Sequence, residues 1–220
     1  MLVTVTSLAD PDLSVLLARP EVAVIVPAHL SKRGWLLEDG DAPRARLITS
    51  RGPLEANQCS GVWVRVARVT AGDLLHVDAT DRDYVAAEMT AFLAAMMTSL
   101  ACPVFNRPTA TSLVGLAWNQ QHWWRAAARN GLATCTGQGR ECQEGVGIVI
   151  LDGQPLLESE VAEEHVQDAL RFAAIARVRL VRVELCRVHG KVRRASLTPR
   201  LTERLLEAIE KQVGAECAIP

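Results

Sequence analysis

The sequence has no excess of charge of either sign and no long hydrophobic run, and each absence excludes a class of protein. The 24 Lys and Arg residues balance 25 Asp and Glu residues, for a net charge of −1. The chain therefore lacks the positive field of a general nucleic-acid-binding protein. No apolar stretch is long enough to span a bilayer, and the N-terminus has no basic region or apolar core typical of a signal peptide. We expect a cytoplasmic protein with neither nucleic acid nor membrane as a partner.

The six cysteines form no metal-binding pattern, because the sequence contains no CxxC pair. Cys102 and Cys186 lie within apolar runs and are expected in the core. Cys135 and Cys142 flank a glycine-rich segment, where they are either free thiols or a loop disulfide or zinc pair. A cytosolic protein is expected to keep its thiols reduced. The sequence therefore predicts no metal site from a recognised motif.

The middle of the chain contains a helix, a short strand, a polar turn and a second helix. Apolar residues recur at intervals of three and four, which predicts a first helix capped by Thr80 and Asp83. The run Cys102–Phe105 predicts a strand that Asn106–Pro108 ends, and the second helix is predicted to stop at Gly131. The residues predicted to face the core from the first helix are Val85, Met89, Phe92, Met96 and Leu100. This order is typical of one edge of an open α/β sheet.

The remaining chain alternates predicted strands with predicted helices, which indicates an α/β fold. The strands predicted in the first half are residues 2–6, 21–26, 46–49 and 61–69. We expect them to form an open, mostly parallel sheet with flanking helices. The polar segment 133–145 is the predicted boundary. The second half is predicted to be a small α+β lobe made of a strand at 146–151, a turn at Asp152-Gly153, a helix at 160–176, a hairpin and a final helix capped by Thr198.

Four features of the first half occur in a recognisable order. They are the strand Gly61–Arg65 with the sequence GVWVR, the acidic Glu88 on a helix, the turn Asn106–Pro108 and the helix end Ala128–Leu132. In this order they resemble the N-terminal domain of ATP-grasp ligases. The nearest resemblance is to the branch that includes glutamate-adding ribosomal-protein ligases and the macrocycle-forming ligases of graspetide biosynthesis. The resemblance implies a pre-ATP-grasp-like α/β domain at residues 1–134.

The second half resembles the C-terminal lobe of the same family, but it departs from the family at the metal site. The resemblance places Glu184 on the strand whose acidic residue helps to bind the nucleotide's magnesium. It places Arg194 and Ser196 where the family carries the glutamate and asparagine that hold Mg²⁺ against the phosphates. A guanidinium cannot ligate a cation, and Mg²⁺ requires oxygen donors. We therefore expect no catalytic residue and no ATP or Mg²⁺ cofactor.

The resemblance also implies that one lobe is missing. In the family, a lobe with the phosphate-gripping lysine lies between the two halves, whereas this chain has only a short linker at residues 135–145. Phosphoryl transfer needs charge neutralisation in a closed site, which this arrangement would not supply. The expected third part is an ATP-grasp C-terminal-lobe-like domain at residues 146–220. The whole is predicted to be a reduced, non-catalytic ATP-grasp-like protein, or pseudoenzyme.

Arg65, on a predicted strand, and Arg107, at the end of another, are candidate substrate-binding or anion-binding residues, together with Glu184 and Arg194. Arg65 shares a strand face with Trp63, so the pair is either a packed Trp with a surface Arg or the wall of a cleft. Arg107 either belongs to a turn that ends a strand or faces a ligand at the carboxyl end of the sheet.

Trp123 and Trp124 are candidate interface residues. They follow His122 on one helix, and three adjacent large side chains cannot all face one way, so at least one should be exposed. An exposed Trp is either a binding hot spot or a chance surface residue. A basic cluster in the second half is either a solvated surface or a site for phosphate, carboxylate or an acidic peptide. Its members are Arg177, Arg179, Arg182, Arg187, His189, Lys191, Arg193, Arg194 and Arg200.

Three functions follow from these patterns. The first is a binding or scaffold subunit of a peptide or natural-product modification pathway, as a homo-oligomer such as a dimer or paired with an enzyme of that pathway. The second is an enzyme with a rebuilt cleft for an acidic small molecule or peptide, although no nucleophile–base pair is evident. Its candidate residues are Arg65, Arg107, Arg194, Glu184 and His189. The third is a metal or redox sensor built on Cys135 and Cys142. The altered metal positions favour the first.

Overall fold

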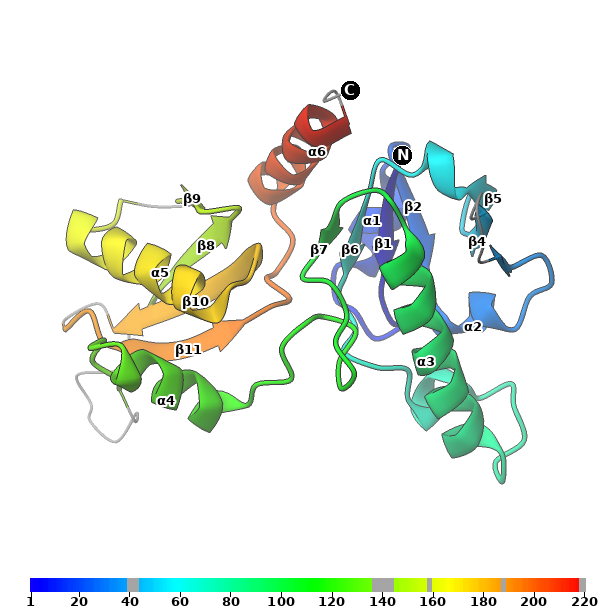
Figure 1. The fold of residues 1–220 in the computed structure, drawn as a ribbon, viewed down its shortest axis with the longest axis horizontal. Coiled ribbons are helices and arrows are strands. Elements are labelled where there is room, and N and C mark those ends of the chain that lie inside the picture. The colour runs from blue at the N-terminus through cyan, green and yellow to red at the C-terminus, as the bar shows by residue number, and fades with distance from the viewer. Residues whose placement is uncertain (39–43, 136–144, 158–159, 187–188, 218–220) are drawn as a thin grey trace. The chain divides into compact units, whose positions relative to one another are not determined.

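The chain forms two compact units (Figure 1). The computed structural model describes residues 1–38, 44–135, 145–157, 160–186 and 189–217. Unit 1 comprises residues 1–116 and 209–220, and unit 2 comprises residues 117–208. The division falls before helix α4 (Gln120–Arg129), which contacts strand β11 (Val192–Ser196) of the second unit. The domain boundary at residue 134 stays a prediction. Most of the predicted linker, 136–144, lies outside the described residues, and its replacement of a lobe stays a prediction.

Unit 1 is built on a four-stranded parallel sheet in the order β2-β1-β6-β7. Its strands are β1 (Leu2–Val5), β2 (Val22–Ile25), β6 (Gly61–Val64) and β7 (Val104–Phe105). All residues of these strands are buried, as expected for a parallel sheet covered on both faces. The prediction of an α/β fold with an open parallel sheet is confirmed here.

A second, three-stranded antiparallel sheet in unit 1 was predicted only in part. It consists of β3 (Leu36–Glu38), β4 (Arg44–Thr49) and β5 (Gly52–Glu55). β4 contains the predicted strand 46–49. β3 and β5 carry no β-branched residue, and β5 contains Pro53, so their sequences gave no strand signal.

The helices of unit 1 are α1 (Leu13–Ala18), α2 (Pro27–Leu30) and α3 (Arg82–Ser99), with 3₁₀ turns η1 (Ala56–Gln58) and η2 (Ala71–Asp73). The predicted core face is right only toward the end of α3, where Met96 and Leu100 are buried. Val85, Met89 and Phe92 are only half-buried, and the Phe92 ring packs edge-on against Trp35. The other buried residues of the helix are Ala86, Leu93 and Met97. α3 is apolar on most sides, so its periodicity does not single out one face. Thr80 does not cap it, because its hydroxyl donates to Asp78. Among the described helices, none combines the length and apolarity needed to cross a membrane.

Unit 2 contains a four-stranded antiparallel sheet in the order β11-β10-β8-β9. The strands are β8 (Gly145–Leu151), β9 (Gln154–Leu156), β10 (Leu180–Cys186) and β11. The predicted Asp152-Gly153 turn joins β8 to β9. Both turn residues have positive φ, +48° and +74°, which the primed hairpin turns require.

Helices α4 and α5 (Glu163–Ala176) belong to unit 2, while α6 (Glu203–Cys217) begins in unit 2 and ends in unit 1. α4 follows the prediction: the Asn119 side chain accepts the N–H of His122 at 3.0 Å, and Gly131 has φ +75° just beyond the helix end. α6 begins later than predicted. Thr202, not Thr198, accepts the first free N–H, from Leu205 at 3.2 Å, and Gly214 lies inside the helix.

Candidate functional site

The carboxyl edge of the parallel sheet in unit 1 is the first place where its topology predicts a ligand. From β1 the chain passes to β2 on one side and later returns to β6 on the other, so β1 and β6 flank a switch point. Ligands of open α/β sheets bind at such points, beyond the strand ends. Thr6 and Arg65 follow these two strands directly.

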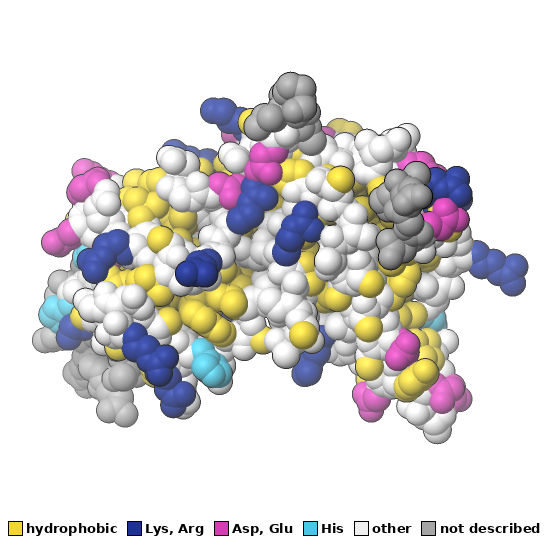
Figure 2. All heavy atoms as spheres, in the orientation of Figure 1, with side chains coloured by type: hydrophobic (Ala, Val, Ile, Leu, Met, Phe, Trp, Pro, Cys, Tyr) yellow, Lys and Arg dark blue, Asp and Glu magenta, His cyan; other side chains and the backbone are white. Residues whose placement is uncertain are grey.

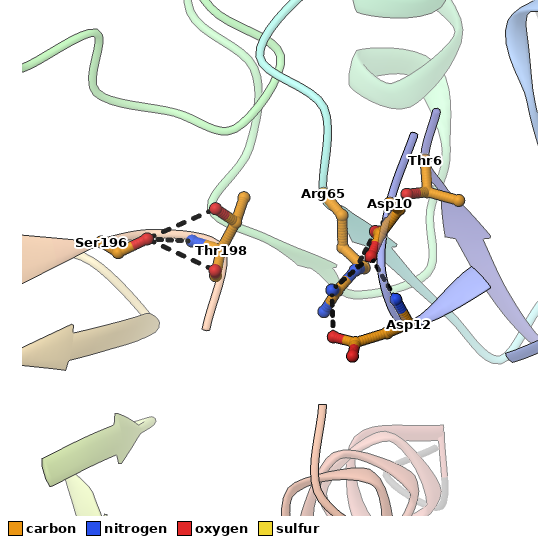
Figure 3. Close-up of polar contacts among 6 residues, drawn as sticks. All are labelled: Thr6, Asp10, Asp12, Arg65, Ser196 and Thr198. Atoms are coloured by element: carbon orange, nitrogen blue, oxygen red, sulfur yellow. Dashed lines mark hydrogen bonds and ion pairs between the residues drawn. The ribbon is translucent and has the colours of Figure 1, made fainter. Parts of the chain in front are cut away.

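The switch point is filled by a buried ion cluster made of Thr6, Asp10, Asp12 and Arg65 (Figure 3). Arg65 donates to both carboxylate oxygens of Asp10, at 2.7 and 3.0 Å, and to Asp12 at 2.6 Å. The side chains of Arg65 and of both acids are at most 8% exposed. The guanidinium also lies 4.5 Å from the centre of the Trp63 ring, a cation–π contact. The donors of Arg65 therefore face carboxylates of its own chain, and its role as an anion clamp stays a prediction.

The cluster also sets the ionisation of Asp10. Burial raises the pKa of this carboxyl group, but hydrogen bonds from Arg65, from the Thr6 hydroxyl and from the backbone N–H of Asp12 together hold the pKa below its ordinary value. Asp10 is thus a carboxylate at neutral pH. The ionised cluster fastens the loop after β1 to the end of β6.

Arg107 has a structural partner at the end of α3. Its guanidinium donates to the carbonyls of Met97, Thr98, Leu100 and Cys102, at 3.3 to 3.5 Å. The last carbonyls of a helix lack partners within the helix and carry the negative end of its dipole, so they attract a cation. The side chain therefore caps α3, and its role as an anion-binding residue stays a prediction.

In unit 2 the strand register brings the predicted metal-site residues onto one face of the sheet. Glu184 pairs directly with Arg194 on β11 and with Gly147 on β8, while Arg182 pairs with Ser196. Side chains alternate between the faces of a sheet, so these polar residues share a face. We call Arg182, Glu184, Arg194 and Ser196 the charged face. The alternate β10 residues, Val181, Val183 and Leu185, are fully buried.

The charged face contains an ion pair that the sequence did not predict. Arg182 donates to Glu184 at 2.8 Å, and the two side chains are 39% and 27% exposed. A Cβ atom at Gly147 would lie 2.4 Å from the Arg182 guanidinium, so the glycine leaves space for it. Ser196 accepts a hydrogen bond from the Thr198 N–H at 3.2 Å (Figure 3). The two-residue spacing of Arg182 and Glu184 on an alternating strand was the signal for this pair.

Other members of the basic cluster also have partners. Arg179 forms a two-pronged ion pair with Asp152, at 2.6 and 2.8 Å. The carbonyl of Arg193 accepts hydrogen bonds from Gln120 and from the Trp124 indole. Arg187 lies outside the described residues. Two described members of the cluster, Arg179 and Arg182, therefore pair with acids through their side chains.

The two candidate interface tryptophans differ in environment. Trp123 is 3% exposed, and its ring packs 4.8 Å from that of Trp118 and 5.5 Å from that of Phe172. It fills the core of unit 2, and its role as an interface residue stays a prediction. Trp124 is half-buried, with its indole N–H 3.0 Å from the Arg193 carbonyl, and its interface role stays a prediction. At least one of the three adjacent side chains was expected to be exposed, and in the structure it is His122.

A groove of about 690 Å³ runs along α3 within unit 1. Small side chains line it on the helix side: Ala86, Ala87, Thr90, Ala91 and Ala94. The segments 68–71 and 109–113 and the acidic Asp83 complete the lining. In Figure 2 the surface over the middle of α3 is mostly hydrophobic or uncharged, with acidic side chains near the lower end of the helix. Such a groove offers contact area without a dominant charge.

The cysteine sensor and the metal site have no further support. Cys135 is buried, and Cys142 lies outside the described residues, so their pairing stays a prediction. Within the described ranges, no three His, Cys, Asp or Glu residues are grouped to hold a metal ion.

Comparison with known proteins identifies the fold. No protein-family model matches the sequence, and no protein of curated function is significantly similar to it. Among solved structures, a RiPP-associated ATP-grasp ligase of Chryseobacterium gregarium, in complex with ADP and a leader and core peptide, is 10% identical. It has a TM-score of 0.67, with 100% of this chain and 97% of that chain covered.

Two further ligases are similar to the same degree. The macrocyclase MdnC of Microcystis aeruginosa MRC, bound with the precursor peptide MdnA, is 12% identical with a TM-score of 0.65, covering 91% of this chain and 92% of that one. The ATP-grasp ligase PsnB, complexed with a minimal precursor, is 12% identical with a TM-score of 0.65. The match covers 96% of this chain and 98% of that one. At these identities the likeness shows the fold alone: an ATP-grasp-like fold.

Proposed function

We propose that this chain is a non-catalytic binding subunit, with an ATP-grasp-like fold, in a pathway that modifies peptides. The observation that carries the proposal is the composition of the charged face. Where the resemblance expects oxygen ligands for magnesium, Glu184 is paired with Arg182 and faces Arg194 across the strand pair. The fold neighbours bound to precursor peptides support the peptide pathway.

The charged face does not fit a magnesium ion. A hard cation needs several oxygen donors, and here one carboxylate stands between two guanidinium-bearing residues. Two positive side chains beside the site would repel a divalent cation. The Ser196 oxygen already accepts the N–H of Thr198. We therefore derive no phosphoryl-transfer step for this chain.

The alternative of a rebuilt enzyme loses two of its three proposed anion clamps. Arg65 is held by Asp10 and Asp12, and Arg107 is held by the end of α3. Arg107 and Arg194 are both exposed, but the Arg107 guanidinium is engaged by carbonyls at the end of α3. Binding of a partner is the better-supported role.

We propose an extended peptide as the ligand of the α3 groove. Its lining of alanines and threonines admits a backbone closely, while Arg68 and Asp83 give it one charge of each sign. An enzyme of the same pathway, or a second copy of the chain, is the proposed assembly partner.

The first test measures nucleotide binding. Isothermal titration calorimetry of the full chain with ATP and Mg²⁺ is expected to show no saturable binding. A double variant, Arg194→Glu with Ser196→Asn, rebuilds the family's metal pattern and is expected to gain Mn²⁺ binding, measured by electron paramagnetic resonance. Arg200→Glu makes the same charge change elsewhere and is expected to gain none. Magnesium-dependent ATP binding by the unaltered chain with a Kd of about 1 μM or tighter would refute the non-catalytic role.

The second test identifies the partner. The tagged chain is isolated from its source cells and the intact complex is weighed by native mass spectrometry, with the bound peptide sequenced. Ala91→Trp fills the groove and is expected to abolish peptide capture. Ala174→Trp, at an exposed position of α5, makes the same substitution outside the groove and should leave capture unchanged. Equal capture by both variants would remove the groove from the proposal.

A further inference from the structure

Two cysteines far apart in sequence meet in unit 1. The sulfur atoms of Cys59 and Cys102 are 3.6 Å apart. Cys59 precedes β6 and Cys102 precedes β7, and these strands are hydrogen-bonded neighbours, with the Val62 N–H donating to the Pro103 carbonyl at 2.8 Å. The sheet itself therefore holds the two thiols together. A disulfide between them requires the sulfur atoms to approach to about 2.05 Å.

The two thiols have different access to solvent. Cys59 is 6% exposed, and its thiol contacts the Gly61 carbonyl at 3.3 Å. Cys102 is only partly buried. A dissolved oxidant consequently reaches Cys102 first. The buried sulfur of Cys59 lies against that of Cys102.

The surroundings of Cys102 favour its thiolate. When Cys102 is deprotonated, the Cys59 thiol can donate to it, and this hydrogen bond lowers the pKa of Cys102, to which the positive charge of Arg107 adds. The same contact raises the pKa of Cys59, and burial raises it further. A partly exposed thiolate beside a cation, with a second thiol adjacent, is the arrangement of reactive and resolving cysteines.

We propose that Cys59 and Cys102 form a reversible disulfide when the protein meets a peroxide, with Cys102 as the reacting thiol and Cys59 as the resolving thiol. No sequence motif marks this pair, because 43 positions separate its members. It is distinct from the Cys135 and Cys142 pair considered from the sequence.

The chemistry balances with hydrogen peroxide as the oxidant. The Cys102 thiolate attacks one peroxide oxygen, an S–O bond forms, the O–O bond breaks, and hydroxide leaves as water after taking a proton. The Cys59 sulfur then attacks the Cys102 sulfur: the S–S bond forms, the S–O bond breaks, and the leaving hydroxide takes the Cys59 proton as a second water. Two thiols are oxidised, and one peroxide is reduced to two waters.

The disulfide would close a loop that includes β6 and α3. Closing a loop restricts the unfolded chain, so oxidation is expected to raise the unfolding midpoint of unit 1. It would also remove the reactive thiolate beside Arg107. The oxidised and reduced forms thus differ in stability without a change of fold.

The test treats the full chain with stoichiometric hydrogen peroxide. Intact mass spectrometry is expected to show a loss of about 2 Da, and thiol titration after denaturation should fall from six thiols to four. Peptide mapping should find the Cys59–Cys102 link, and dithiothreitol should reverse it. Cys102→Ser is expected to abolish the loss. Cys135→Ala, at a cysteine as buried as Cys59 (6% exposed), should leave the loss of mass intact.

A second variant tests the order of the two steps. In Cys59→Ala no resolving thiol remains, so a sulfenic acid on Cys102 should accumulate and be trapped by dimedone. Mapping of the unaltered chain decides the matter if this variant fails to fold. A disulfide between other cysteines, unchanged oxidation in Cys102→Ser, or six free thiols after peroxide treatment would each overturn the proposal.

Discussion

Arginine–carboxylate pairs occur in both units, but in opposite settings. In unit 1, Arg65 and its two acids are at most 8% exposed. In unit 2, Arg182 and Glu184 pair at a similar distance, 2.8 Å, but are 39% and 27% exposed. A buried pair must stay complete, because any member left alone is a desolvated charge. An exposed pair can be opened at little cost. The comparison assigns a structural role to the Arg65 cluster. It leaves the Arg182–Glu184 pair free to open when a ligand binds or when one residue is substituted.

The largest expected effect comes from breaking the buried cluster. Arg65→Met leaves Asp10 and Asp12 buried without their cation, and we expect a loss of about 3–5 kcal/mol in the free energy of unfolding. Urea denaturation followed by tryptophan fluorescence measures it. Arg46→Met, which breaks a pair with Glu55 that is 42% and 43% exposed, should cost less than about 1 kcal/mol. Similar losses in the two variants would contradict the comparison.

Acid should weaken the same cluster. The pKa of Asp10 in the folded protein lies below its ordinary value of 3.8, so the carboxylate form stabilises the fold. That contribution is complete above the ordinary value and is lost as the pH falls below it. We expect the thermal midpoint to drop more steeply in the wild type than in Asp10→Asn as the pH falls below about 4. Parallel curves for the two proteins would show that Asp10 is not the group responsible.

A smaller effect is expected at the end of α3. Arg107→Ala removes a cation that donates to four carbonyls, and we expect a loss of about 1–2 kcal/mol. Hydrogen exchange should accelerate at the last turn of α3 and stay unchanged in α5. If exchange stays slow at that turn, Arg107 is not its cap.

The smallest effect is expected on the charged face. Arg182→Ala opens a pair in which both side chains reach solvent, so the free energy of unfolding should fall by less than about 0.5 kcal/mol. The same urea titration measures it. A loss of stability near that of Arg65→Met would mean that the exposed pair matters as much to the fold as the buried cluster. The charged face could then not be altered without unfolding the protein.

Local signals in the sequence predicted the local structure well. Asn119 and Gly131 delimit α4, and the Asp152-Gly153 pair makes the expected hairpin, because each acts on neighbouring backbone. The family resemblance placed Glu184 and Arg194 in one region, and the register brings them directly opposite.

Roles set by distant partners could not be predicted. Arg65 stands 55 positions from Asp10, so nothing near it in sequence indicated a buried pair. Cys59 and Cys102 meet only because β6 and β7 are neighbours. The Trp123 ring packs against Phe172 of α5 in the core of unit 2. Helical spacing alone cannot show a contact between two helices.

The outer side of β11 has one more consequence. The Val192 N–H donates to the Ala133 carbonyl and the Cys135 N–H donates to the Val192 carbonyl, both at 2.8 Å, while Gln120 and Trp124 occupy the carbonyl of Arg193. These backbone groups already have hydrogen-bond partners, so an added strand could not pair with them. β-Augmentation and edge-to-edge aggregation are therefore blocked along this border. A peptide that meets this border must be recognised through its side chains.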